Sequence, residues 1–147
     1  MPAVPEVAGS WVGPVLSLLD VRVARLGEWR AEGAMILGGR FARLSYRGPT
    51  GVGELTVGHH REDNVWTIGW MDTSLLDTEW LVLRGSGEQA HAEGTWWTGS
   101  SGPRWEWTIR VTAEADDLGI EMSSRSPEGR AELALRAQLR RVGSGPA

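Results

Sequence analysis

Residues 104–111 read RWEWTIRV, and this stretch decides the fold. Its tryptophan, isoleucine and valine side chains alternate with arginine, glutamate and threonine. Successive side chains of a β-strand point to opposite faces, so a period of two residues indicates a strand with one buried face. We therefore predict a strand here with its apolar side toward a core.

The same alternation continues outward from this stretch. Residues 130–140, RAELALRAQLR, have a composition that suits a helix, but strict alternation over the whole segment favours a strand. Clusters of Gly, Asp, Asn and Pro between the periodic segments are typical of turns. Further strands are predicted near residues 10–16, 20–30, 32–47 with a break at Gly38-Gly39, 52–60, 65–72, 77–84, 90–98 and 117–125.

Nine or ten antiparallel strands in 147 residues must close on themselves or fold into a sandwich, because open sheet edges invite aggregation, and of the two we favour closure. We therefore predict an all-β protein with a single antiparallel up-and-down β-barrel. The length fits one domain. The barrel is expected over residues 10–141, with flexible tails at 1–9 and 142–147.

The charge and amino-acid composition exclude several classes of function. The formal net charge is −4, which offers no broad cationic surface for nucleic acid. The chain has neither cysteine nor lysine, so thiolate and Schiff-base chemistry are excluded. There is no run of about 20 apolar residues and the start, MPAVPEVAGS, does not resemble a signal peptide. We expect a cytoplasmic protein without a membrane partner.

Several motifs resemble those of a known family. Residues 9–13, GSWVG, are similar to the entry strand of calycin-like barrels, and residues 36–41, ILGGRF, followed by YRG at 46–48, resemble a block of the bacterial family numbered 1579 among domains of unknown function. Residues 58–63, WMDTS at 70–74, Glu121-Met122 and residues 139–141 follow in order. The resemblance implies a ten-stranded, calycin/lipocalin-like barrel of the nitrobindin type with an interior cavity. It implies no settled activity.

Nine tryptophans, beside one Phe and one Tyr, supply nearly all the aromatic bulk. Indole suits either a thick core or the wall of an apolar cavity. We interpret the chain as a barrel that holds a small apolar or aromatic molecule. Trp11 is also expected to point inward, and the ligand-binding candidates are Arg40, Trp66, Trp70, Trp96, Trp105 and Trp107.

The alternative is a cofactor-independent enzyme, such as a cyclase, an isomerase or a pericyclase-like catalyst, with His59 and Asp72 as acid–base candidates. His59 shares a strand face with Leu55 and Val57 and is expected to point inward, opposite to His60. Simple register does not bring His59 to Asp72. The competing interpretations are that His59 has a structural role and that Asp72 caps the Thr73-Ser74 turn that follows it.

Two further positions leave alternatives open. Arg40 either forms a structural ion pair with Glu121 or binds a substrate carboxylate. Trp96 rather than Trp97 is expected inside, with His91 and Glu93 toward solvent. No metal-ligand spacing or serine nucleophile motif occurs, so neither metal nor cofactor is expected. A homodimer stays open.

The first prediction concerns haem, because the nitrobindin-like haem proteins hold iron through a histidine near the C-terminus. Residues 104–141 contain no histidine. We expect the purified protein to be colourless and a haem titration to give no sharp one-to-one Soret band. Such a band, abolished by His59→Ala, would contradict the prediction and show a rebuilt site.

Overall fold

The computed structural model describes residues 3–18, 25–49, 51–73, 76, 80–97 and 104–143, and every regular element in them is a strand. The ten strands are β1 (Gly9–Ser17), β2 (Arg25–Ile36), β3 (Phe41–Gly48), β4 (Gly51–His60), β5 (Val65–Asp72), β6 (Leu81–Ser86), β7 (Ala90–Trp97), β8 (Arg104–Glu114), β9 (Asp117–Arg125) and β10 (Ala131–Val142).

Each strand pairs antiparallel with the next along the chain, and β10 pairs with β1. This closes a single up-and-down barrel of ten strands and confirms the fold class predicted from alternation. Among the described residues, no helix has the length and apolarity needed to cross a membrane.

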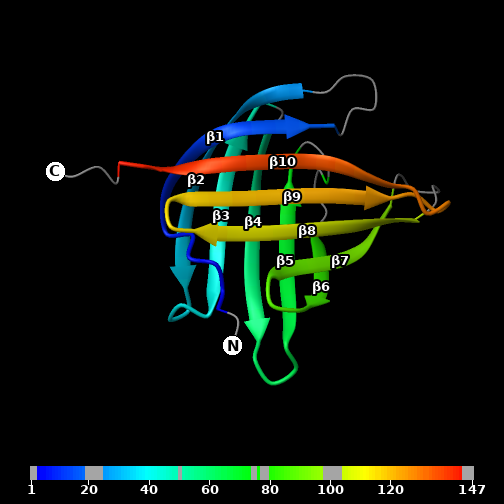
Figure 1. The fold of residues 1–147 in the computed structure, drawn as a ribbon, viewed down its shortest axis with the longest axis horizontal. Helices are drawn as coiled ribbons and strands as arrows, with labels where there is room; N and C mark the ends of the chain where they lie inside the picture. The colour runs from blue at the N-terminus through cyan, green and yellow to red at the C-terminus, as the bar shows by residue number, and fades with distance from the viewer. Residues whose placement is uncertain are drawn as a thin grey trace.

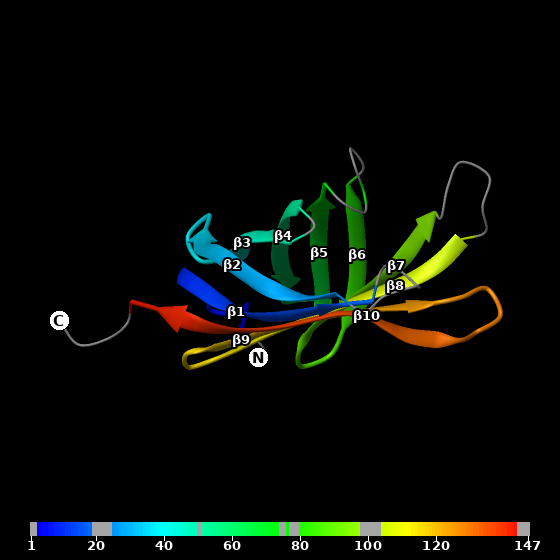
Figure 2. The same cartoon turned by 90° about the horizontal axis from the view of Figure 1, so that it is seen from above.

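The closed barrel is flattened into two layers whose strands run in different directions. In Figure 1, β8, β9, β10 and β1 run across the view, while β3 to β6 run up and down it. Figure 2, seen from above, shows β2 curving from one layer toward the other. Side chains from the inner faces of the two layers form the core between them.

The alternation at residues 104–111 is present in the structure as a buried and an exposed face. Trp107, Ile109 and Val111 are buried, whereas Glu106 and Arg110 on the same strand are exposed. Of the other tryptophans that we predicted to face inward, Trp11, Trp66 and Trp70 are buried and Trp105 is half-buried.

The predicted strand break at residue 31 is wrong. The sequence interpretation ended one strand at residue 30 and began another at 32, but β2 runs unbroken through Ala31, which lies buried opposite Trp11. The turn lies where the break was predicted, at Leu37 to Arg40, because Leu37, Gly38 and Gly39 adopt positive φ. The predicted strand residues 20–24, 77–79 and 98 lie outside the described residues.

The second prediction tests this division of β8 into two faces with neighbouring residues. We expect Ile109→Ala to lower the free energy of unfolding by about 2–5 kcal/mol, because it leaves a cavity in the core. Arg110→Ala, the matched control on the exposed face, should change it by less than about 0.5 kcal/mol. Urea unfolding followed by circular dichroism measures both values, and similar effects of the two variants would contradict the assignment.

Candidate functional site

A buried hydrogen-bond network lies at the end of the barrel where β3 and β5 end. The Tyr46 hydroxyl donates to Asp72 Oδ2 at 2.5 Å and accepts from Trp70 Nε1 at 2.9 Å. Asp72 is only 8% exposed and is the one charged residue in the core formed by the described residues. Tyr46 therefore fixes a carboxylate inside otherwise apolar surroundings.

Tyr46 reaches Asp72 across an intervening strand because that strand has a glycine there. Tyr46 on β3 pairs with Gly53 on β4, and Gly53 pairs with Asp72 on β5. A Cβ atom at Gly53 would lie 2.2 Å from the Tyr46 hydroxyl, so any larger residue would displace the ring. Gly53 is therefore a structural requirement of the network.

Two aromatic stacks extend the network. Trp29 stacks on Tyr46 with ring centroids 3.9 Å apart, and Trp70 stacks on Trp107 at 5.4 Å. We call Trp29, Tyr46, Trp70, Asp72 and Trp107 the aromatic–carboxylate cluster. All five are buried, and they come from β2, β3, β5 and β8.

Burial raises the pKa of the Tyr46 phenol well above its usual value, and the negative charge and hydrogen bond of Asp72 raise it further. The hydrogen bond from Trp70 acts in the opposite direction. Tyr46 is therefore held in its neutral form and donates a hydrogen bond to the Asp72 carboxylate.

His59 lies at the other end of the same strands. It pairs with Trp66, whereas Asp72 follows six residues later on β5, about 20 Å away at the rise of a strand. The expectation that His59 and Asp72 form no dyad is confirmed. His59 Nε2 lies 2.9 Å from Asn64 Oδ1, and the imidazole packs on the Trp66 ring at 4.3 Å.

The immediate surroundings of the two histidines differ. His59 Nδ1 is buried and has no hydrogen-bond partner among the described residues. His60 is exposed and lies 3.1 Å from Asp63, as expected for the outward member of the pair.

One structural interpretation stays a prediction and another needs correction. The Asp72 carboxylate accepts from Tyr46 and the Asp72 backbone carbonyl accepts from the Leu76 N–H, while a side-chain cap on the turn at Thr73-Ser74 would involve Ser74, which lies outside the described residues. Arg40 is exposed in the turn between β2 and β3, and Glu121 pairs with Arg136 at 3.4 Å. The predicted Arg40–Glu121 pair is wrong, because Glu121 on β9 lies directly opposite Arg136 on β10, which supplies the opposite charge.

The remaining candidates fall into three groups. Trp66, Trp70 and Trp107 are packed in the core, and Trp105 is partly accessible at the end near residue 104. On β7, Glu93 is exposed as expected and His91 is half-buried. The side chains of Trp96 and Trp97 lie outside the described part of the chain. Contact of any of these residues with a ligand stays a prediction.

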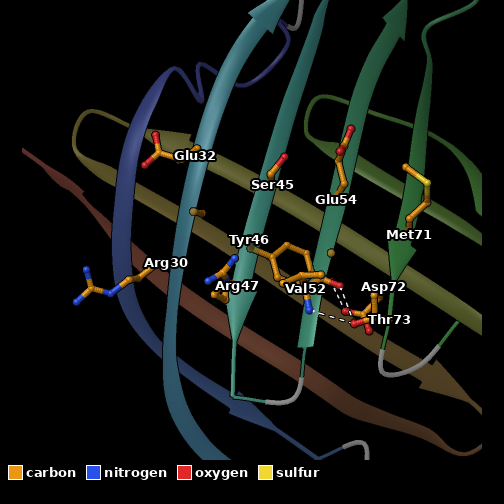
Figure 3. A pocket seen from close by; sticks show the side chains of 12 residues that line it. Arg30, Glu32, Ser45, Tyr46, Arg47, Val52, Glu54, Met71, Asp72 and Thr73 are labelled. Atoms are coloured by element: carbon orange, nitrogen blue, oxygen red, sulfur yellow. Dashed lines mark hydrogen bonds between the residues drawn. The ribbon is translucent and has the colours of Figure 1, made fainter. Parts of the chain in front are cut away.

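The outer face of the same strands is hollowed by a groove of about 690 Å³ (Figure 3). Two outward-pointing rows form its walls, and the backbone of the row between them, which includes Tyr46, Gly53 and Asp72, forms its floor. One row, the basic row, comprises Arg30, Arg47, Val52 and Thr73; the other, the acidic row, comprises Glu32, Ser45, Glu54 and Met71.

Sequence reasoning missed Tyr46 and Trp29. Tyr46 was assigned only a packing role, and its partner Asp72 is 26 residues away. A signal was present in Gly53, a glycine within a strand whose absent side chain marks close approach by a neighbour. Reading that signal requires the register of three strands.

Comparisons with protein-family models and with curated proteins find no match to this chain. The resemblance to the family numbered 1579 therefore rests on the motifs quoted above. Within the described residues, no three His, Asp or Glu side chains gather as a metal site would require.

The third prediction uses the alkaline titration of Tyr46. Because the pKa is raised in the folded state, Tyr46 contributes stability that is fully present below about pH 10 and is lost as the pH rises above it. The chain has no lysine or cysteine and no second tyrosine, so few other groups titrate there. Urea unfolding from about pH 8 to 11.5 should show this loss in the wild type and much less of it in Tyr46→Phe.

At neutral pH the same variant should be destabilised by about 1–3 kcal/mol, because Asp72 and Trp70 lose a buried partner. Equal pH dependence of the two proteins would contradict the assignment. Tyrosinate absorbance of the folded protein provides an independent measurement, and it should appear at higher pH than in urea.

Proposed function

We propose that this protein is a carrier or sensor that binds a small apolar or aromatic molecule at the barrel end where the aromatic–carboxylate cluster lies. The observation that carries the proposal is the Asp72 carboxylate, 8% exposed and oriented by Tyr46 among three indoles. A carboxylate in an apolar core costs folding free energy, and such groups gather at functional sites. We place the protein in the cytoplasm.

The chemistry of the cluster indicates the kind of ligand. Indole faces favour flat apolar groups through stacking, and a few polar groups in such a wall fix one orientation. Half-buried Leu81, which pairs with Trp70 and packs against the core, extends the apolar wall. Trp105, two residues before Trp107 on the same face of β8, is also half-buried. A molecule seated there would contact apolar rings, and its polar group would join the hydrogen bonds of Tyr46 and Asp72.

The geometry gives less support to the cofactor-independent enzyme. The two acid–base candidates lie at opposite ends of β4 and β5, so they cannot act on one bound molecule. The Tyr46 hydroxyl already donates to Asp72 and accepts from Trp70, an arrangement that favours holding a group in place over shuttling a proton.

The fourth prediction tests the proposal by quenching of tryptophan fluorescence with a panel of neutral and cationic aromatic compounds. At least one compound should bind the wild type, and Asp72→Asn should weaken it about tenfold or more, since charge-assisted hydrogen bonds are the strong ones. Asp63→Asn, in the exposed turn after β4, is the matched control and should bind as the wild type does.

A panel in which no compound quenches would refute the proposal. So would equal binding by Asp72→Asn and the wild type. Tyr46→Phe, which keeps the ring that stacks on Trp29, provides a second variant if Asp72→Asn does not fold.

A further inference from the structure

The groove lies on the outer face of β2 to β5, whereas the aromatic–carboxylate cluster is buried on their inner side. The two share only the row that contains Tyr46 and Asp72, which forms the floor of the groove (Figure 3). Its volume of about 690 Å³ is within the range of small-molecule sites. The distribution of charge along its two rows indicates what it would bind.

Two cations lie directly opposite each other in the basic row. Arg30 on β2 pairs in register with Arg47 on β3, and like charges at such positions repel. Arg30 has only a solvent-exposed partner, Glu28, at 3.5 Å. Among the described residues, the Arg47 guanidinium has no ion pair and no hydrogen bond. An anion placed between the two guanidinium groups would relieve their repulsion.

The acids across the groove are already engaged by their own neighbours. Both carboxylate oxygens of Glu32 accept from the Ser10 hydroxyl, at 2.9 and 2.8 Å. Glu54 lies 4.0 Å from Arg43, which is outside the groove. Both acids therefore already have a hydrogen-bond or ion-pair partner, although Glu32 keeps its negative charge because the Ser10 hydroxyl is neutral. Arg47 in the basic row has neither kind of partner among the described residues, so it is the group in the groove that is most open to a ligand.

Apolar side chains continue from the basic row along the same face. Val52 and Met71 line the groove and are 43% and 42% exposed. Beyond them, Trp80 lies over Gly69 of β5 and is 65% exposed. Val82 on β6 pairs with the same glycine and is 48% exposed. These four large apolar side chains are all exposed on one face of the sheet, whereas exposed apolar residues are usually scattered singly over a protein surface. Contiguous patches of this kind mark binding sites.

We propose that this groove binds a small organic oxyanion, whose carboxylate or phosphate is held by Arg30 and Arg47 and whose apolar group lies on Val52 and Met71. The guanidinium fork matches the paired oxygens of either anion. The site uses the opposite side of the strands from the proposed ligand of the cluster, so each can be present without the other.

The fifth prediction is tested by amide and arginine Nε–H chemical shifts of labelled protein titrated with monohexyl phosphate and with hexanoate. We expect saturable shifts at Arg30, Arg47, Val52 and Met71 with at least one of them, and about tenfold weaker binding of inorganic phosphate. Hexylammonium, which has the same apolar chain and the opposite charge, should not saturate these positions.

Arg47→Gln should weaken binding about tenfold or more, and Arg110→Gln, at an exposed arginine on β8, should leave it unchanged. Trp107→Phe, which changes the aromatic–carboxylate cluster at a residue that does not line the groove, should also bind normally, which separates this site from the proposed function. Equal binding by Arg47→Gln and the wild type, or by hexylammonium and monohexyl phosphate, would overturn the proposal. Binding to vesicles of anionic phospholipid but not to monohexyl phosphate would also overturn it, in favour of a membrane surface.

Discussion

The pairing of the first strand with the last is the constraint on which the rest of the structure depends. Without it, β1 and β10 would be open edges with unpaired backbone groups. The seam tolerates a weak point, since Gly13 and Pro14 interrupt the ladder between the Val12–Arg140 and Val15–Ala137 pairs. Gly13 is required there, because a Cβ atom would lie 2.1 Å from the Gln138 carbonyl oxygen.

Arg141 reinforces the seam at one end. Its guanidinium lies 4.3 Å from the centre of the Trp11 ring, donates to the Ala8 carbonyl and pairs with Asp116 at 3.3 Å. One side chain therefore links the segment before β1, the turn before β9 and the last strand. Closure in turn fixes which inner faces oppose each other, and so it brings Trp107 of β8 onto Trp70 of β5.

The interior combines large and very small side chains. Trp11, Trp66, Trp70 and Trp107 have almost no exposed surface, and alanines on several strands leave room for them. In such a core the position of one indole depends on its neighbours, because close-packed interiors transmit changes in volume. The Tyr46–Asp72 pair is embedded in this packing, which keeps its hydrogen bonds short and its carboxylate away from water.

The sequence by itself determined the strands and their faces. Alternation is a local property, so RWEWTIRV was enough to predict which side of β8 is buried, and positive φ at Gly38-Gly39 agrees with the predicted turn. Residue 31 was misassigned, because a small buried alanine gives no local sign that the strand continues.

Only the tertiary structure decided which side chains meet. Tyr46 finds Asp72 two strands away because Gly53 leaves space between them, and Glu121 takes Arg136 rather than Arg40 as its partner. The outer groove likewise depends on the register of four strands, which aligns residues far apart in the chain into rows. Register is set by hydrogen bonding and packing over the whole closed sheet, and no single segment contains that information.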